Sequence, residues 1–412
     1  MKRVARHYLT LFVVGVGIMI VTQCAGTAPP DKPASCTTDK SSLIIVDTFH
    51  LSPTKLASPV GLTYDHYDHL FAAGTATDAS NLKHWIVRRS DDLGLTWTTV
   101  DDFSLDAAHD SQAMAISTDL NETIIVAGTS IDAAGNSHWI VRELTPGQFV
   151  WETMDDIGGL NAFTNATARA IAYDPVGYVY VSGSVATGGV DQWFVRRSAD
   201  GGNTWVDSDN YANANSIYST AIASDSQANM YAVGVSRPTA TNRWLVRKSV
   251  DHGLNWTNVD NFLSNANNTK PTVVKIGPKD EVYVAGVESG VTGTWIVRKS
   301  TNMGLTWATT DTFGVNNPAA GPTGGMLNTM GKLSLAGTTY HTGLSKFLGV
   351  LRFTLDGTSW ANDSAVPRDG TSTTAFSSII SDIAGNVYLM GYSTAAGNPN
   401  DWIVQKLDCK TP

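Results

Sequence analysis

The sequence has few cysteines, few histidines and little charge. Its 412 residues include three cysteines and nine histidines, and only 16% are Asp, Glu, Lys or Arg. The histidines show no metal-ligand spacing, and the chain has neither a G-x-S-x-G nucleophile turn nor a Walker-type phosphate loop. Aspartate pairs such as Asp207 and Asp209 lack the twelve-residue calcium loop. We therefore expect no metal, no cofactor and no active site of these kinds.

Clusters of basic residues are also absent. The formal net charge is −9, whereas a nucleic-acid-binding protein needs a positive patch that neutralises phosphates. We therefore expect no binding to nucleic acid.

The N-terminal segment combines basic and apolar residues in the manner of a signal peptide. Lys2, Arg3 and Arg6 precede an apolar run over residues 8–21 that is short for a membrane span. Residues 1–23 are therefore predicted to be a signal peptide, and residues 24–41 a linker. The stretch ending at Cys24 resembles a bacterial lipobox, although Gln23 stands where a small residue is usual. Cys24 either carries a lipid or is removed by cleavage near residues 26–28.

Export would place the chain in an oxidising compartment, where cysteines form disulfides. Cys36 precedes the first expected strand and Cys409 follows the last one. We therefore predict a disulfide between them, and a short tail over residues 410–412. The expected protein is a monomer that is an outer membrane lipoprotein, periplasmic or secreted, and its membrane contact is limited to the lipid at Cys24.

An internal repeat dominates the rest of the chain. A segment of the type Trp-Ile-Val-Arg recurs with a spacing of about 51 to 55 residues. Its copies begin at Trp85, Trp139, Trp193, Trp244 and Trp295, with weaker copies at 349–352 and 402–405. Such a period is typical of a repeat architecture in which each copy forms one structural unit.

A turn with a fixed pattern follows most copies and ends in a second tryptophan. The pattern S-x-D-x-G-x-T-W is degenerate in the second copy and one residue short in the sixth. We expect glycine to supply a positive φ, and Asp and Ser to accept hydrogen bonds within the turn. The residues that we expect to build it are Ser90, Asp92, Gly94, Trp97, Ser198, Asp200, Gly202, Trp205, Ser249, Asp251, Gly253, Trp256, Ser300, Asn302, Gly304 and Trp307.

Each copy is expected to contain four strands. Two strands precede the Trp-Ile-Val-Arg strand, and the second ends near a recurring glycine such as Gly183; a fourth strand follows the turn. Four short antiparallel strands form one blade of a β-propeller. Residues 43–49 align with the fourth strand of a copy, and the last copy stops at Cys409 after its third strand. We therefore predict an all-β, seven-bladed β-propeller over residues 42–409, whose last blade is closed by the N-terminal strand.

These turns make the chain similar to the BNR or Asp-box propeller superfamily, which includes sialidases, sortilin-type receptor ectodomains and many bacterial envelope proteins. The resemblance covers the chain after the signal peptide, and seven expected blades differ from the six of the sialidases. It implies the fold but no particular activity.

Residues that recur in every copy are expected to be structural. The repeated arginines of the third strands and aspartates of the fourth strands are interpreted as Arg–Asp rungs within blades. A ligand site should instead use residues that break the repeat, on the face that carries the loops between blades. The candidates are His109, Asp110, Arg169, Arg237, Glu288, Tyr340, His341 and Arg368, with Asp369 beside the last.

A sialidase-like site would need three converging arginines and a Tyr–Glu pair. Arg169, Arg237 and Arg368 with Tyr340 and Glu288 are the nominees, but the family's Arg-Ile-Pro motif is missing, and the nearest match is Arg237-Pro238. We therefore predict a non-catalytic module that binds a protein or glycan at the loop face. Protein is favoured because that face has few aromatic side chains. The alternatives are a sialidase-like glycoside hydrolase and an envelope scaffold without a discrete ligand.

Overall fold

The computed structural model describes residues 43–158, 163, 165–212, 215–239, 241–264, 267–290, 293–317, 319–328, 331–366, 373–382, 384–394 and 400–407. The signal peptide, Cys24, Cys36, Cys409 and Arg368 lie outside these residues. The described residues are strands and turns without a helix. No membrane-spanning helix was found in this part of the chain.

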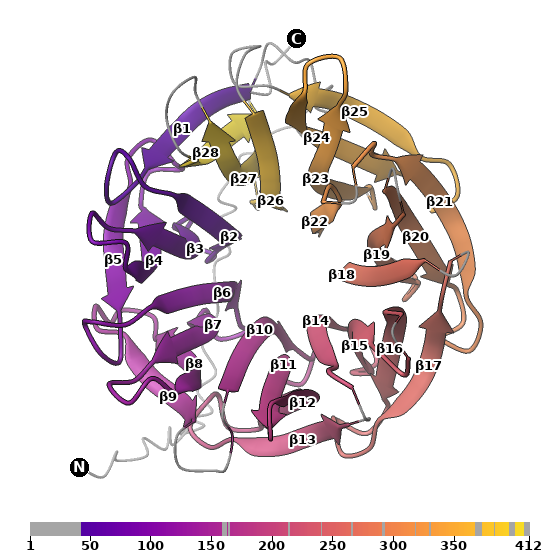
Figure 1. Ribbon diagram of the computed structural model, residues 1–412, viewed down its shortest axis with the longest axis horizontal. Coiled ribbons are helices and arrows are strands. Elements are labelled where there is room, and N and C mark those ends of the chain that lie inside the picture. The colour runs from indigo at the N-terminus through magenta and orange to yellow at the C-terminus, as the bar shows by residue number, and fades with distance from the viewer. Residues whose placement is uncertain are drawn as a thin grey trace, which may run out of the picture.

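The strands stand in concentric positions around a central axis (Figure 1). The innermost strands are β2 (Ala57–Tyr64), β6 (Ser111–Thr118), β10 (Asn165–Tyr173), β14 (Tyr218–Ser224), β18 (Asn268–Ile276), β22 (Pro322–Leu327) and β26 (Thr373–Ser381). Outside them lie β3 (Leu70–Thr77), β7 (Ile124–Ile131), β11 (Val179–Thr187), β15 (Met230–Ser236), β19 (Val282–Ser289), β23 (Leu333–His341) and β27 (Val387–Thr394).

The third position holds the Trp-Ile-Val-Arg strands. They are β4 (Lys83–Ser90), β8 (Ser137–Leu144), β12 (Val190–Ser198), β16 (Arg243–Ser249), β20 (Thr294–Ser300), β24 (Lys346–Thr354) and β28 (Asp401–Leu407). The outer strands are β1 (Leu43–Phe49), β5 (Thr98–Phe103), β9 (Glu152–Ile157), β13 (Val206–Tyr211), β17 (Thr257–Phe262), β21 (Ala308–Gly314) and β25 (Ala361–Val366).

The strands form antiparallel sheets of four, each of which we call a blade. The orders β2-β3-β4-β5, β14-β15-β16-β17, β18-β19-β20-β21 and β22-β23-β24-β25 follow the sequence. A single bridge between Asn165 and Ser137 joins β6–β9 to β10–β13, which we count as two blades. In the remaining sheet, β1 pairs with β28, so the first strand of the chain is the outer strand beside its last three.

The core lies between neighbouring blades. All seven residues of β15 are buried, whereas the outer strand β17 is partly or fully exposed. A strand that is covered on both faces reads as a nearly continuous apolar run, which is why the second and third strands lack a clear alternation. Trp244 illustrates the packing, because it is fully buried, stacks edge-on against Phe262 of its own blade and lies against Gly286 of the next.

The expectation of Arg–Asp rungs within blades was wrong, because these pairs join adjacent blades. Arg247 of β16 binds both carboxylate oxygens of Asp209, which lies on the outer strand β13 of the preceding blade, at 2.6 and 2.8 Å. Its guanidinium also lies 4.2 Å from the ring centre of Tyr211 on the same strand. Equivalent pairs are Arg88–Asp47, Arg142–Asp101, Arg196–Asp155, Arg298–Asp260 and Arg352–Asp311.

The physical reason is the direction in which the arginine projects. Its stem runs sideways from the third strand, where the aromatic residue and aspartate of the preceding outer strand offer a stacking surface and a paired acceptor. Burial raises the pKa of Asp209, and the hydrogen bonds and charge of Arg247 oppose that shift. These arginines therefore hold blades to one another.

Candidate binding site

The repeated turns contain the hydrogen bonds that their sequence predicts. In the turn of β12 and β13, Ser198 Oγ donates to Asp200 Oδ1 at 2.8 Å, and Gly202 N donates to Ser198 Oγ at 2.9 Å. Gly202 has a φ of 90°, a conformation that favours glycine. Asn302 replaces aspartate without loss of the turn, because its Oδ1 accepts from Thr306 N and its Nδ2 donates to Thr306 Oγ1. The turns are structural.

This comparison predicts a small effect of Asp200→Asn at neutral pH. The new amide can donate to Thr204 Oγ1 in the way that Asn302 donates to Thr306, whereas Asp200→Ala should cost about 1 kcal/mol of unfolding free energy. Burial tends to raise the pKa of Asp200, but hydrogen bonds from Thr204 and Ser198 lower it overall. Its contribution is therefore present above about pH 4 and is lost as the pH falls through the lowered pKa. Urea unfolding at pH 7 and pH 3 should show a smaller pH dependence for Asp200→Asn than for the unchanged protein; an equal dependence would contradict this.

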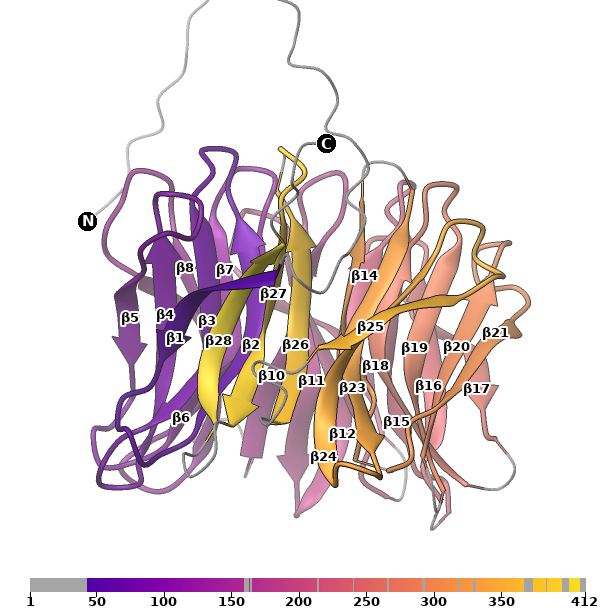
Figure 2. The ribbon, with the colours of Figure 1, turned by 90° about the horizontal axis from the view of Figure 1, so that it is seen from above.

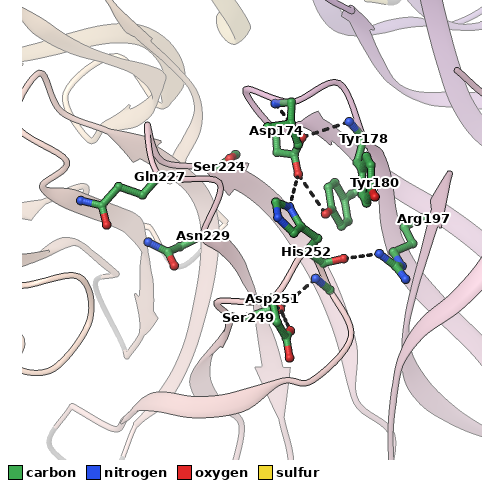
Figure 3. Close-up of polar contacts among 12 residues, drawn as sticks. Asp174, Tyr178, Tyr180, Arg197, Ser224, Gln227, Asn229, Ser249, Asp251 and His252 are labelled. Atoms are coloured by element: carbon green, nitrogen blue, oxygen red, sulfur yellow. Dashed lines mark hydrogen bonds and ion pairs between the residues drawn. The ribbon is translucent and has the colours of Figure 1, made fainter. Parts of the chain in front are cut away.

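A polar cluster near one of these turns resembles a catalytic group but belongs to the repeat. Asp174 is fully buried and accepts hydrogen bonds from Tyr180 Oη and from the amide of Tyr178, and its Oδ2 lies 3.2 Å from His252 Nδ1 (Figure 3). In the next blade, Tyr231 Oη donates to Asp225 in the same way. The Asp–Tyr contact therefore recurs as a turn-stabilising device.

A β-bulge interrupts each innermost strand at the same register. In β10 the pairing shifts between Ala168 and Ala170, so that Arg169 is the extra residue. Bulges re-aim a side chain and are frequent beside functional sites. The extra residues around the axis are Val60, Met114, Arg169, Thr220, Thr272, Thr323 and Ser377.

The threonines at this position link neighbouring blades. Thr220 Oγ1 donates to the carbonyl oxygen of Pro271 at 2.8 Å, and Thr272 Oγ1 donates to that of Pro322 at 2.6 Å. Thr323 makes the same bond to Phe376. Each acceptor precedes the bulged residue of the next blade. The position therefore has a clear structural role in these blades.

Arg169 breaks this pattern. Its Nε is buried and has no hydrogen-bond partner among the described residues. Its guanidinium carbon lies 5.3 Å from the ring centre of Tyr218, which begins the innermost strand of the next blade. Burial lowers the pKa of Arg169, and Tyr218 and Asp191 oppose that shift. The charged group is thus partly desolvated without the bidentate acceptor that the other repeated arginines have.

Further cations lie around the same tyrosine. Lys270 is the third residue of β18, and its Nζ lies 5.8 Å from the ring centre of Tyr218. Its pKa is lowered by burial and then by the charge of Arg169. Burial raises the pKa of Tyr218, while Arg169 and Arg237 lower it and Asp191 raises it. Arg169, Tyr218, Lys270, Arg237 and Asp191 form what we call the inner-strand cluster.

The cluster contains two of the candidates that the sequence suggested. Arg237 directly follows β15 and donates from Nε to Asn242 Oδ1 at 2.7 Å. Because Tyr218 is paired with Val235 near that end of β15, Arg237 and Tyr218 share the face that carries the loops between second and third strands. Tyr218, Lys270 and Asp191 were missed. The feature that distinguishes Tyr218 and Lys270 is their position, because both lie two residues before a bulged threonine.

The other candidates make local contacts on different blades. His109 Nδ1 lies 2.8 Å from Asp106 Oδ1, and the Asp110 carboxylate lies 3.3 Å from Lys83 Nζ. Glu288 accepts from Ser264 Oγ at 2.6 Å. Tyr340 stacks on Phe347, and His341 Nδ1 accepts from Leu344 N at 3.2 Å. Among the described residues, no contact joins Tyr340 or Glu288 to Arg169. Arg368 lies outside the described residues.

A search of the described residues for clusters of three or more His, Cys, Asp or Glu that could hold a metal ion found none. A hollow of about 110 Å³ lies at the turn of the sixth copy, beside Tyr283, Asp356 and Gly357. The turn of the sixth copy, which is one residue short, places Gly357 against Tyr283. A Cβ at Gly357 would lie 2.0 Å from the Tyr283 hydroxyl.

Comparison with known proteins shows the fold but no family. No protein-family model matches the chain, and no curated protein matches it. A solved protein of unknown function from Dyadobacter fermentans is similar over 90% of this chain and 100% of its own, with 14% identity and a TM-score of 0.55. The Trypanosoma rangeli sialidase matches over 87% of this chain at 11% identity and a TM-score of 0.52. The GH74 enzyme of Niastella koreensis matches over 86% at 16% identity and a TM-score of 0.55.

The match covers only 56% and 55% of those two enzymes' chains. At such identities the likeness is one of fold, a β-propeller of four-stranded antiparallel sheets. Propeller folds carry many unrelated activities, so the chemistry of this chain has to be argued from its own residues.

Proposed function

We propose that the chain is an exported, non-catalytic β-propeller that binds a protein or a glycan through the face that carries the loops between blades. In this proposal seven blades surround the axis, and β1 completes the last blade. The signal peptide, the Cys36–Cys409 disulfide and the two alternatives for Cys24, a lipid or removal by cleavage, belong to the same proposal. The single observation that carries it is the inner-strand cluster, in which Arg169 breaks the repeat and is left without an acceptor among the described residues.

Three features support binding over catalysis. The repeated arginines and aspartates bind one another between adjacent blades. Asp174 belongs to a turn whose Asp–Tyr contact recurs in the next blade, and His252 contacts Asp174 from the turn between β16 and β17. Tyr340 and Glu288, the nominated nucleophile pair, are each engaged in separate local contacts. The contacts among the described residues do not bring Tyr340 and Glu288 together, whereas covalent catalysis requires a nucleophile beside its general base.

The competing proposal is a sialidase-like glycoside hydrolase. It is favoured by the fold that the chain shares with a sialidase and by the approach of Arg169 and Arg237 to one tyrosine. A scaffold without a ligand is the third possibility, and it predicts no binding at all.

Binding and turnover can be separated on the same protein preparation. The mature protein should be incubated with an aryl sialoside, while a glycan array and a panel of envelope proteins are probed for binding. We expect saturable binding to one class and aglycone release equal to that in buffer. Release that grows with protein concentration and disappears in Arg169→Thr would establish the hydrolase instead. Absence of both would favour the scaffold.

A further inference from the structure

The inner-strand cluster has an excess of positive charge that the described residues do not neutralise. Arg169 and Lys270 lie near the Tyr218 ring, and Arg237 adds positive charge from the end of β15. Asp191 is the one carboxylate among the described residues that influences Arg169 and Tyr218. None of the three cations lies within 4 Å of a carboxylate in the described part of the chain, whereas Arg247 and its equivalents each bind an aspartate. This excess is unusual in a chain whose net charge is −9.

The cluster is built into the innermost strands. Arg169, Tyr218 and Lys270 come from β10, β14 and β18, which are neighbours around the axis (Figure 1), and these strands run between the two faces (Figure 2). Arg169 and Lys270 both approach the Tyr218 ring, at 5.3 and 5.8 Å from its centre. Three consecutive blades therefore bring two cations, the partly buried Arg169 and the exposed Lys270, near one aromatic ring.

Such an arrangement has a cost that a ligand could repay. Arg169 is partly buried, and its buried Nε without an acceptor is unfavourable. Like charges on Arg169 and Lys270 also repel one another. The repeat has a solution that avoids both penalties, namely the threonine that blades β14–β17 and β18–β21 carry at this register. An arginine at this position therefore needs a reason other than holding blades together.

We propose that Arg169, Lys270 and Tyr218 bind an oxyanion, a carboxylate or phosphate group, at the loop-bearing end of the innermost strands. The planar guanidinium can donate two parallel hydrogen bonds to such a group, the lysine adds a compact positive charge, and the tyrosine hydroxyl adds a donor. Arg237 contributes longer-range attraction from the end of β15. The inference rests on the proposed binding function and specifies its ligand: an anionic group, which belongs either to a free oxyanion or to an acidic sugar.

Calorimetric titration of the mature protein distinguishes these sources. The probes are inorganic phosphate, glucuronate and, as the neutral control, glucose. Binding of phosphate and glucuronate assigns a general oxyanion site, binding of glucuronate alone assigns the carboxylate of an acidic sugar, and binding of phosphate alone assigns a free oxyanion. Glucose binding that equals glucuronate binding, or no binding of either anion, overturns the proposal.

The decisive variant is Arg169→Thr, because it installs the residue that the repeat itself uses. Its hydroxyl is placed to donate to the carbonyl of Ser219, the equivalent of the Pro271 carbonyl that Thr220 uses. We expect anion affinity to fall by about 30-fold or more, while the melting temperature without ligand stays equal or rises. Lys270→Gln should weaken affinity in the same direction.

Arg243→Thr is the matched control. Arg243 is a half-exposed arginine that bonds Asn261, so its loss removes one positive charge outside the cluster and should change affinity less than about 3-fold. Equal losses in Arg243→Thr and Arg169→Thr would show a diffuse charge effect and overturn the site. A fall in melting temperature for Arg169→Thr with unchanged anion binding would assign Arg169 a structural role and also overturn it.

These experiments test the oxyanion site separately from the proposed function. Glycoside turnover together with anion binding would reject the non-catalytic module and leave the oxyanion site in place. Partner binding that is insensitive to Arg169→Thr would leave the module in place and reject this site.

Discussion

Replacement of Asp209 by alanine should destabilise the protein by about 3–5 kcal/mol. Asp209 and Arg247 are both buried, and the change leaves the guanidinium without its bidentate acceptor between two blades. Removing one partner of a buried pair costs this much because the remaining charge stays desolvated. The measurement is urea unfolding followed by tryptophan fluorescence at neutral pH.

Asp207→Ala on the same strand is the control. Its carboxylate contacts Arg196, but 62% of its side chain is exposed, and an exposed pair contributes about 0–1 kcal/mol. Similar losses for the two variants would contradict the view that the repeated arginines act as buried links between blades.

Gly183→Ala should destabilise the protein by about 3 kcal/mol. A Cβ at Gly183 would lie 2.0 Å from the carbonyl oxygen of Thr167 and 3.0 Å from Trp139 of the preceding blade. Overpacking costs about 1–3 kcal/mol, and the upper end applies because the obstacle is a backbone atom that cannot rotate away. The fall in unfolding free energy should accompany a shift in the near-ultraviolet signal of the buried tryptophans.

Gly314→Ala controls for the substitution itself. Nothing lies within 4 Å of a Cβ at Gly314, and its φ is not positive, so alanine should change the unfolding free energy by less than about 0.5 kcal/mol. If Gly183→Ala is as mild as this control, the recurring glycine is not required by close packing of strands and blades.

Much of the fold could be predicted because the repeat presents the same evidence several times. Trp244 and its counterparts, the glycine of each turn and the strand at 43–49 could be placed by alignment of one copy with another. Single copies are less informative: the second turn, which ends at Trp151, has lost its pattern, yet β8 and β9 still pair as elsewhere. The tertiary setting imposes the hairpin there.

The partners of the repeated side chains could not be predicted, because the repeat does not show whether a side chain contacts its own blade or a neighbouring one. Arg247 and Asp260 belong to the same copy of the repeat. Nevertheless, Arg247 binds Asp209 of the preceding blade and Asp260 binds Arg298 of the next. The inner-strand cluster was partly predicted for a related reason. Arg169 stood out because it breaks the repeat, whereas Tyr218 and Lys270 became relevant only through the bulge register and the contact between innermost strands.

We place the ligand of this propeller where Arg169 interrupts the repeat. Crystal structures of the mature protein soaked with glucuronate and, separately, with inorganic phosphate test this placement. We expect a carboxylate or phosphate group between Arg169 and Lys270, with guanidinium-to-oxygen distances of about 2.7–2.9 Å. A cluster that stays empty at saturating glucuronate and at saturating phosphate, with Arg169 bonded to the carbonyl of Ser219 in the manner of the threonines, would contradict this site.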